Sequence, residues 1–294
     1  MKFTNIRVMN FENALRGMRH PKESYHLSDS KFGIGSIEEC FEDYEVAREW
    51  LDFMENINGN KASEEVSEKI IEMADTWLIK NGVLYPPGKN SQYFEYAFIG
   101  PQDLRLAQQL ITGGSEHRKF MRQIFVSVDI TAPLYWWKEF DTYKVGTVAN
   151  STSTMHKIHS KPIDITCFET DDYDNSLGLI DDINIGVRVD CFIDDLEQLR
   201  QKYLDTKDVK YWKELIRWLP ESWLQTRTVT MNYENLLAMC SKGQRRFHKL
   251  NEWSGIHSEV EESFIQFARS LPYAQELIFI DELDSDFYPK VDFS

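Results

Sequence analysis

Cysteine is scarce in this chain, and its four copies stand far apart at Cys40, Cys167, Cys191 and Cys240. No two of them share the short spacing of a zinc-binding or redox pair. Disulfide frameworks belong to small secreted proteins with a much denser cysteine content. We therefore expect reduced, mostly buried thiols, no metal site and a cytoplasmic location.

Long apolar runs are also missing. No stretch approaches the ~18 consecutive apolar residues that a membrane-spanning helix needs. The first residues, Met1–Val8, have the pattern of a short strand and not that of a signal peptide. The sequence thus predicts a protein without membrane contacts.

Positive charge is in deficit. Lys and Arg total 33 against 48 Asp and Glu, which gives a formal net charge of −15. Binding to nucleic acid in general requires a basic face, so we expect none. A cationic pocket inside an acidic shell is still compatible with a small anionic ligand, because a pocket focuses its own field.

The common catalytic motifs do not occur. The sequence contains no phosphate-binding loop, no dinucleotide-binding glycine motif, no HExxH and no GxSxG. His156 and His159 stand three residues apart, but no third ligand follows at a useful spacing for a metal. A functional assignment therefore has to come from less common patterns.

The chain has ample material for a core, since hydrophobic residues make up 42% of it and it includes 8 Trp. Apolar spacing predicts helices over residues 36–57, 63–78, 101–112, 131–140, 193–203, 208–218, 232–248 and 257–270. Alternation predicts strands over residues 1–8, 92–99, 120–128 and 183–189. Long helices with few strands indicate the α+β class, and we expect a single elaborated domain over 1–294.

One segment is unusually rich in small hydroxyl side chains. Residues Thr147–Thr154 read Thr-Val-Ala-Asn-Ser-Thr-Ser-Thr and follow a predicted helix that carries Trp136 and Trp137. Hydroxyls and exposed backbone N–H groups can surround a phosphate or a base edge. The alternative is a solvated Ser/Thr loop without a ligand.

Two ordered blocks of residues carry a family resemblance. Ser115-Glu116-His117 precedes a predicted strand and helix, which lead into Thr142–Thr154; later, Leu219-Pro220 precedes Asn232–Leu237. This order resembles the flavin-dependent thymidylate synthases, which have a Glu-His pair, the signature RHRxxSxNExSxR, a Leu-Pro and an Asn-x-Arg-x-Leu-Leu helix. The similarity spans roughly residues 105–271, and residues 1–95 form a divergent, helical N-terminal part.

The resemblance implies a fold and an activity. It implies a mixed or antiparallel sheet flanked by long helices, and a homotetramer that holds FAD between subunits. It also implies reductive methylation of dUMP at C5, with methylenetetrahydrofolate and NADPH as co-substrates. The flavin would perform the redox chemistry, while the protein binds and orients the reactants.

Matching positions give the candidate site residues. The resemblance implies that the cofactor contacts His117, Lys144, Asn150 and Asn232. It implies that the nucleotide contacts Glu139, Thr147, Thr152, Ser153, Thr154 and Arg217. Three of them also have a structural alternative: His117 at a strand start, Lys144 as a cation at a helix end, and Asn232 as a helix N-cap.

The departures from the family pattern leave three functions open. Thr142, Tyr143, Thr154 and Glu234 stand where the family has Arg, His, Arg and Arg. A guanidinium makes stronger, bidentate contacts that none of these side chains can replace. Three functions therefore remain: an active thymidylate synthase, a paralogue that acts on another pyrimidine nucleotide or base, or a non-catalytic oligomer that has the inherited fold and a binding or structural role.

Overall fold

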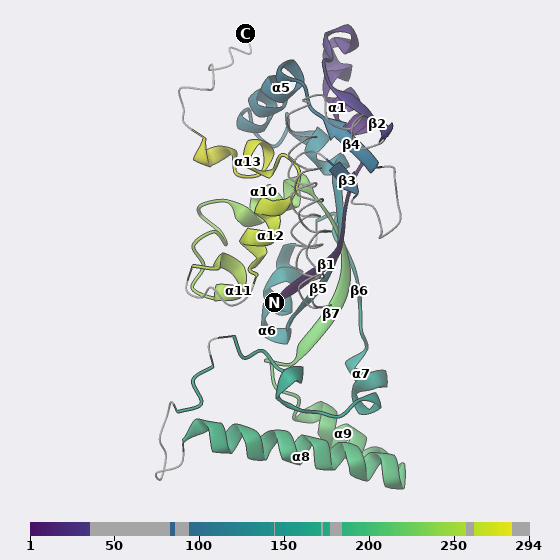
Figure 1. Ribbon diagram of the computed structural model, residues 1–294, viewed down its shortest axis with the longest axis vertical. Coiled ribbons are helices and arrows are strands. Elements are labelled where there is room, and N and C mark those ends of the chain that lie inside the picture. Colours follow the sequence, from purple (N-terminus) through teal and green to yellow (C-terminus); the bar gives the residue numbers. More distant parts are fainter. Residues whose placement is uncertain are drawn as a thin grey trace, which may run out of the picture. The chain divides into compact units, whose positions relative to one another are not determined.

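The computed structural model describes residues 1–35, 83–85, 94–143, 145–171, 173–176, 184–256 and 262–283 (Figure 1). The predicted helices over 36–57 and 63–78 lie outside the described residues, as does Lys144. No helix in the part of the chain with described coordinates has the length and apolarity to cross a bilayer.

The described residues form two sheets. β6 pairs antiparallel with β7, and the neighbouring strands of the smaller sheet are also antiparallel. The larger has the order β1-β5-β7-β6, made of β1 Lys2–Met9, β5 Phe125–Pro133, β7 Leu224–Asn232 and β6 Val148–Ser151. The smaller has the order β2-β4-β3, made of β2 Lys31–Gly35, β4 Phe94–Phe98 and β3 Val83–Tyr85. The strands predicted over 1–8 and 92–99 are confirmed.

The described residues also form α-helices, and together with the sheets they give the α+β class predicted from the sequence. They are α1 Phe11–Arg19, α5 Pro101–Thr112, α6 Leu134–Phe140, α7 Thr154–Lys157, α8 Ile185–Thr206, α9 Val209–Arg217, α10 Tyr233–Cys240, α11 Asn251–Ser254, α12 Phe264–Ser270 and α13 Ala274–Leu277. The predicted bounds of α5 are confirmed. Pro101 at its first position favours the start of a helix, and Gly113 after its last residue favours the end.

The strand predicted over 183–189 is wrong. Asn184 caps a helix instead: its side-chain oxygen accepts the N–H of Val187 at 3.1 Å, and α8 begins at Ile185. The β-branched residues of this stretch favour a strand locally, but α8 continues into Ile193 and Leu196, which are buried in a cluster with Leu215 of α9. Tertiary burial overrides the local preference.

The strand predicted over 120–128 is displaced. Residues Lys119–Gln123 form a 3₁₀ helix, η3, and β5 then continues to Pro133. Thr131 therefore does not cap a helix. Its hydroxyl contacts that of Thr226 on the neighbouring strand at 2.7 Å, and α6 starts at Leu134.

The helix predicted over 232–248 is too long. It ends at Cys240, because the backbone of Ser241 is extended and the chain then turns. The buried guanidinium of Arg246 donates to the carbonyl of Cys240 at 2.9 Å, which satisfies an acceptor at the helix end.

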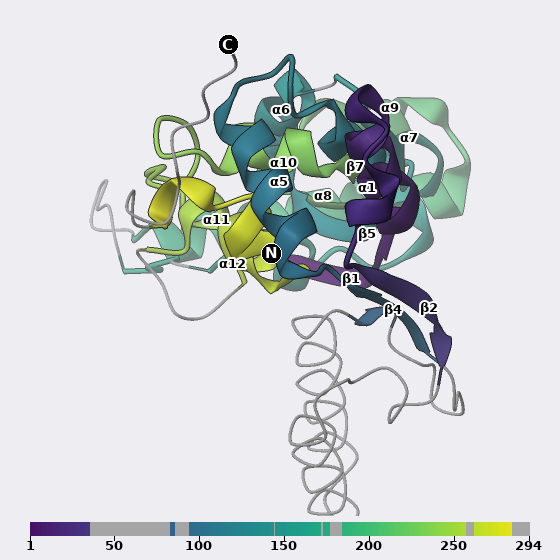
Figure 2. The same cartoon turned by 90° about the horizontal axis from the view of Figure 1, so that it is seen from above.

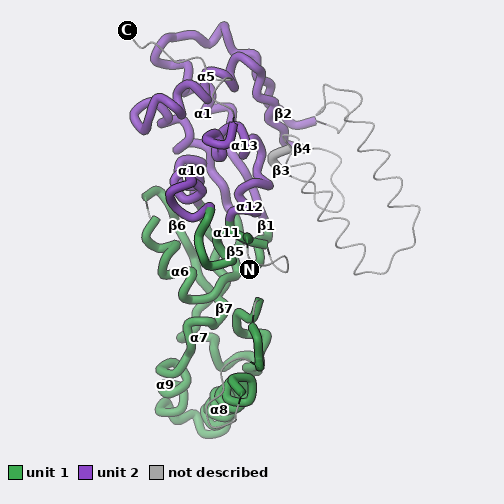
Figure 3. Tube along the Cα trace, turned by 90° about the vertical axis from the view of Figure 1, so that its left-hand side faces the viewer, with its two compact units in different colours: residues 1–5, 128–230, 247–264 green, residues 6–127, 231–246, 265–294 purple. Residues whose placement is uncertain are grey.

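The chain divides into two compact units (Figure 3). Unit 1 comprises residues 1–5, 128–230 and 247–264, and unit 2 comprises residues 6–127, 231–246 and 265–294. A single domain over 1–294, with a divergent part over 1–95 and a core over 105–271, stays a prediction.

Aromatic side chains fill the core of unit 1. Trp136 stacks on Phe140 and on Trp253, with ring centroids 5.1 Å and 4.6 Å apart, and all three are buried. Trp137 is buried beside them, and its indole N–H donates to the carbonyl of Gln225 at 2.9 Å. Both tryptophans therefore serve core packing.

Unit 2 is organised around a buried ion pair. The Arg19 Nε lies 2.5 Å from a carboxylate oxygen of Asp103, and Asp103 is fully buried. The other oxygen of Asp103 accepts the hydroxyls of Ser28 and Ser30 at 2.6 Å and 2.5 Å. This carboxylate links α1, the segment that follows it and α5, which contact one another in this unit (Figure 2).

We expect Asp103→Ala to lower the free energy of unfolding by about 3–5 kcal/mol, because it leaves the Arg19 charge buried without a partner. Glu221→Ala, which breaks the exposed pair of Glu221 with Lys138, is the control and should cost less than about 1 kcal/mol. Denaturant titration of both variants measures the difference. Equal losses of unfolding free energy would show that the buried ion pair stabilises the fold no more than the exposed one.

A second ion pair makes stability depend on pH. In α8 of unit 1, Glu197 accepts two hydrogen bonds of 2.6 Å from Arg200 and one of 2.8 Å from the backbone N–H of Ile163. The hydrogen bond from Arg200 is the main reason that the pKa of Glu197 is lowered to about 2. The unfolded chain therefore binds this proton more readily, and the stabilisation is present above the ordinary glutamate pKa and lost as pH falls towards 2.

We expect Glu197→Gln to cost about 2 kcal/mol of unfolding free energy at pH 7, a value reduced from the full linkage because Glu197 is 25% exposed. The difference from the native chain should shrink between about pH 5 and pH 2. Denaturant titrations at several pH values measure this. Glu214→Gln, which breaks the exposed pair with Arg217, is the control, and the same loss with the same pH dependence in both variants would contradict the assignment.

Candidate functional site

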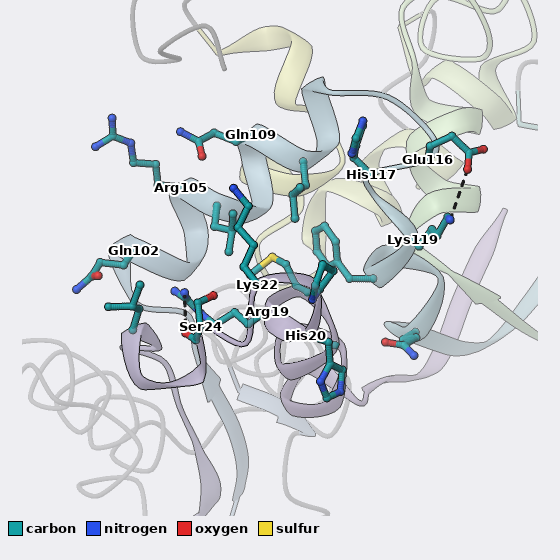
Figure 4. A pocket seen from close by; sticks show the side chains of 18 residues that line it. Arg19, His20, Lys22, Ser24, Gln102, Arg105, Gln109, Glu116, His117 and Lys119 are labelled. Atoms are coloured by element: carbon teal, nitrogen blue, oxygen red, sulfur yellow. Dashed lines mark hydrogen bonds and ion pairs between the residues drawn. The ribbon is translucent and has the colours of Figure 1, made fainter. Parts of the chain in front are cut away.

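Unit 2 contains a cavity of about 1010 Å³ beside the buried ion pair (Figure 4). Its walls come from α1, from the segment after α1, from α5 and from the turn that leads into η3. His117, which the family resemblance places at the cofactor, belongs to that turn and lines the cavity. The first 35 residues, where the resemblance is weak, thus contribute a large part of the wall.

The lining of this cavity is cationic, although the chain as a whole is acidic. The basic residues that line it are Arg19, His20, Lys22, Arg105, His117 and Lys119. Among the described lining residues only Glu116 is acidic, and it pairs with Lys119 at 3.4 Å. The charge of Arg19 is balanced by Asp103.

Two of these cations remain available for a ligand. Lys22 and Arg105 are exposed and form no ion pair with another described residue. They come from opposite walls, Lys22 from the segment after α1 and Arg105 from α5 (Figure 4). Two cations that face one cavity from different elements suit a ligand with more than one anionic oxygen.

His117 occupies a tight turn and not the start of a strand. Gly114 has φ +106°, a conformation that glycine adopts without steric cost, and its carbonyl accepts the N–H groups of His117 and Arg118 at 3.0 Å and 3.2 Å. β5 begins only at Phe125, so capping a strand does not explain the position of His117. The side chain is exposed at the cavity.

Asn232 is a helix cap, as the structural alternative predicts. Its side-chain oxygen accepts the N–H of Asn235 at 3.0 Å, and the side chain of Asn235 accepts the N–H of Asn232 at 3.1 Å. This reciprocal capping box starts α10, and Asn232 is buried. Its predicted cofactor contact stays a prediction, and any such contact has to come from the amide group while the oxygen caps the helix.

The hydroxyl-rich segment lies in unit 1, and a loop over its whole length is corrected, because Val148–Ser151 form a strand. Its first half is β6, the edge strand of the sheet, and Ala149 pairs with Val229 of β7. The ladder continues where Thr152 N–H donates to the carbonyl of Thr226 at 2.9 Å. Hydrogen bonds from a distant strand convert the loop into a strand, which sequence neighbours alone do not reveal.

The side chains of this segment point to solvent or cap the next helix. Asn150 and Thr152 are exposed, while Thr147 and Thr154 are half-buried. Ser153 caps α7, because its hydroxyl accepts the N–H of His156 at 3.0 Å.

The remaining nucleotide candidates of unit 1 have partners of their own. Glu139 on α6 lies 4.0 Å from His248, and Arg217 at the end of α9 pairs with Glu214 one turn earlier on the same helix. Arg217 is therefore committed to a local ion pair. Lys144 lies outside the described residues.

One cation near β6 was not predicted from the sequence. Arg227 of β7 stands opposite Ser151, stacks on the Trp137 ring at 4.2 Å and pairs with Asp141 at 3.1 Å. The family motifs do not include it, and only the strand pairing brings it next to the hydroxyl-rich segment. Arg19, His20, Lys22 and Arg105 were missed as well, although the basic run Arg19-His20-Pro21-Lys22 stands out in an acidic first third.

We expect Asn232→Ala to lower the free energy of unfolding by about 1 kcal/mol through loss of the cap, whereas Asn232→Ser retains a capping oxygen and should lose only a few tenths. Denaturant titration distinguishes the two. Equal losses would mean that the amide group has a structural role beyond the cap.

Comparisons with known proteins give similarity in structure only. No family model matches the sequence, and no curated protein matches it. Thymidylate synthase X (ThyX) from Helicobacter pylori with FAD and dUMP aligns over 96% of this chain and 98% of its own, at 12% identity and a TM-score of 0.49. A second structure of that flavin-dependent enzyme, also with FAD and dUMP, covers 63% and 85% at 15% identity and a TM-score of 0.42.

The UMP/dUMP methylase PolB from Streptomyces cacaoi, bound with 5-Br dUMP, covers 65% of this chain and 83% of its own at 14% identity and a TM-score of 0.39. These structures include the family that the two motif blocks resemble. At such identities and TM-scores, the similarity adds no function to this chain.

Proposed function

We propose that this chain is a flavin-dependent enzyme of the thymidylate synthase type, which binds FAD and methylates dUMP at C5. Methylenetetrahydrofolate would supply the carbon and NADPH the reducing equivalents, in a homo-oligomer, most simply a tetramer. The observation that carries the proposal is the cationic cavity of unit 2 that includes His117. The order of the two motif blocks along the sequence supports it.

The cavity fits a dinucleotide cofactor in size and in charge. Its volume of about 1010 Å³ is at the upper end of the range for small-molecule sites. The Lys22 and Arg105 side chains suit the oxygens of a pyrophosphate, since charge-assisted hydrogen bonds are the stronger kind. The apolar part of the lining suits a flat ring and consists of Met18, Leu27, Leu106, Leu110 and Phe120.

FAD, when bound, would supply the redox chemistry of the reaction. The chain's own residues would bind and orient it: Lys22 and Arg105 hold anionic oxygens, and His117 offers a ring nitrogen at the edge of the cavity. Asn232 is close in the fold, because the turn of His117 is joined to the start of α10 through Arg118 and Glu234. His117 and Asn232 are thus the two predicted cofactor residues that unit 2 contains.

The nucleotide is proposed to contact the polar segment of unit 1. Thr147, Thr152, Ser153 and Thr154 offer hydroxyls and backbone groups, and Asn150 offers an amide. The signature arginines are absent from this segment, and Arg217 is engaged with Glu214.

These replacements favour a second candidate, a paralogue that acts on a different pyrimidine nucleotide or base. Uncharged hydroxyls recognise neutral polar edges better than phosphates. Thermal shift with dUMP, UMP and dCMP separates the two candidates: stabilisation by dUMP alone supports the first, and stabilisation by another pyrimidine nucleotide supports the second.

An absorbance spectrum of the purified chain tests the flavin. The proposal expects a yellow protein, or one that becomes yellow with FAD and then oxidises NADPH. A colourless protein that takes up no FAD would contradict it and leave the non-catalytic alternative.

We expect Lys22→Gln and Arg105→Gln each to weaken FAD binding about tenfold, ~1.4 kcal/mol, because each removes a charged contact to the pyrophosphate. Arg16→Gln is the matched control: it removes the same charge from exposed α1 surface outside the cavity lining and should leave the affinity unchanged. Fluorescence quenching of FAD measures all three. An equal loss of FAD affinity in Arg16→Gln would show that the effect comes from net charge and not from contacts in the cavity.

A further inference from the structure

Glu234 stands where the resembled family has an arginine, and the structure shows what the reversed charge does. It lies in the first turn of α10 with its side chain 14% exposed. One of its oxygens accepts Arg118 Nε at 3.2 Å and Arg122 Nη2 at 3.3 Å, and the other accepts Arg122 Nε. A single carboxylate is therefore shared by two guanidinium groups.

Those two arginines follow His117 along the chain. Arg118 is the next residue along the chain and belongs to the Gly114 turn, while Arg122 lies in η3. His117 itself is exposed and lies in a turn outside the helices and strands. Its N–H donates to the Gly114 carbonyl, and the side chain of the next residue, Arg118, pairs with Glu234.

The start of α10 is a firm anchor for this contact. The Tyr233 N–H donates to the carbonyl of Ile124 at 3.0 Å, and the buried Tyr233 hydroxyl donates to the carbonyl of Pro272 at 2.6 Å. The capping box of Asn232 and Asn235 fixes the helix start itself. Glu234 thus projects from an anchored helix start onto the segment that directly follows His117.

The charge state of Glu234 suits this role. Partial burial by itself raises the pKa of its carboxyl, but the hydrogen bonds from Arg122 and Arg118 outweigh burial, so that the pKa is lowered. The carboxylate is therefore ionised at neutral pH. With one negative and two positive charges, the cluster keeps a net positive charge next to the cationic cavity.

We propose that Glu234 is a positioning residue: it holds Arg118 and Arg122 and thereby fixes the turn that presents His117 to the cavity. The inference rests on the proposed function for the identity of the ligand, FAD. It does not depend on that function for the effect of Glu234 on the turn. Removing the carboxylate has two opposed consequences, since it frees the turn but also adds net positive charge beside the cavity.

The test compares Glu234→Gln with Glu12→Gln. Both remove one negative charge, but Glu12 is exposed in the first turn of α1 and lies outside the cavity lining. If charge alone matters, both variants bind FAD equally or more tightly than the native chain. If positioning matters, Glu234→Gln weakens FAD binding about tenfold, while Glu12→Gln does not.

Hydrogen exchange of the His117 and Arg118 amides gives a readout that does not require a cofactor. We expect Glu234→Gln to accelerate it at least about tenfold, which corresponds to ~1.4 kcal/mol of local stability. Arg118→Gln removes the same contact from the other side and should accelerate exchange likewise, while Glu234 keeps Arg122. This second variant decides the question if Glu234→Gln fails to fold.

Unchanged exchange in both Glu234→Gln and Arg118→Gln would overturn the proposal, as would FAD binding in Glu234→Gln as tight as in Glu12→Gln. A native chain that binds no FAD contradicts the proposed function instead. In that case the exchange rates alone decide whether Glu234 positions His117.

Discussion

The buried pair of Arg19 and Asp103 is the constraint on which the cavity of unit 2 depends. Removing two charges from water costs several kcal/mol for each ion, so a buried pair persists only with further hydrogen bonds. Ser28 and Ser30 supply these bonds to Asp103, and Arg19 also donates to the carbonyl of Ser24 at 3.3 Å. Burial acts to raise the pKa of Asp103, but these partners outweigh it and the pKa is lowered.

The same pair determines which cations meet at the cavity. Arg19 and Asp103 are 84 residues apart in sequence, and each sits close to a cation of its own segment, Lys22 and Arg105. Joining α1 to α5 through a saturated ion pair leaves those neighbours exposed on opposite walls. A second shared carboxylate, Glu234, works in a similar way on the turn of His117. In both cases an acidic residue organises cations and leaves positive charge for a ligand.

The sequence predicted the elements whose boundaries are local. Pro101 and Gly113 delimit α5, Asp208 caps α9 through the N–H of Lys210 at 3.0 Å, and Asn232 was expected as a helix cap. It failed where distant contacts decide. The β-branched start of α8 is exposed but is helical because the helix continues into the buried Ile193 and Leu196. Val148–Ser151 become a strand through pairing with β7.

For the site as well, local sequence signals could be read, whereas contacts between distant segments could not. His117 could be found because the Glu-His pair and the following strand occur close together in sequence. Lys22 and Arg105 could not, because only the fold brings α1 next to α5, and neither belongs to a motif. Arg227 likewise becomes a neighbour of Ser151 only when β6 joins the sheet.

An acidic chain with a cationic cavity has a kinetic consequence. A net charge of −15 repels an anionic ligand at long range, whereas the cavity attracts it only at short range. Added salt would then raise both the association rate and the dissociation rate, which have opposite effects on affinity. Screening would speed the approach of the ligand through the repulsive outer field, and it would also speed departure by weakening the ion pairs of the bound state. Such a site discriminates by residence time more than by capture, and it works best for ligands present at high concentration.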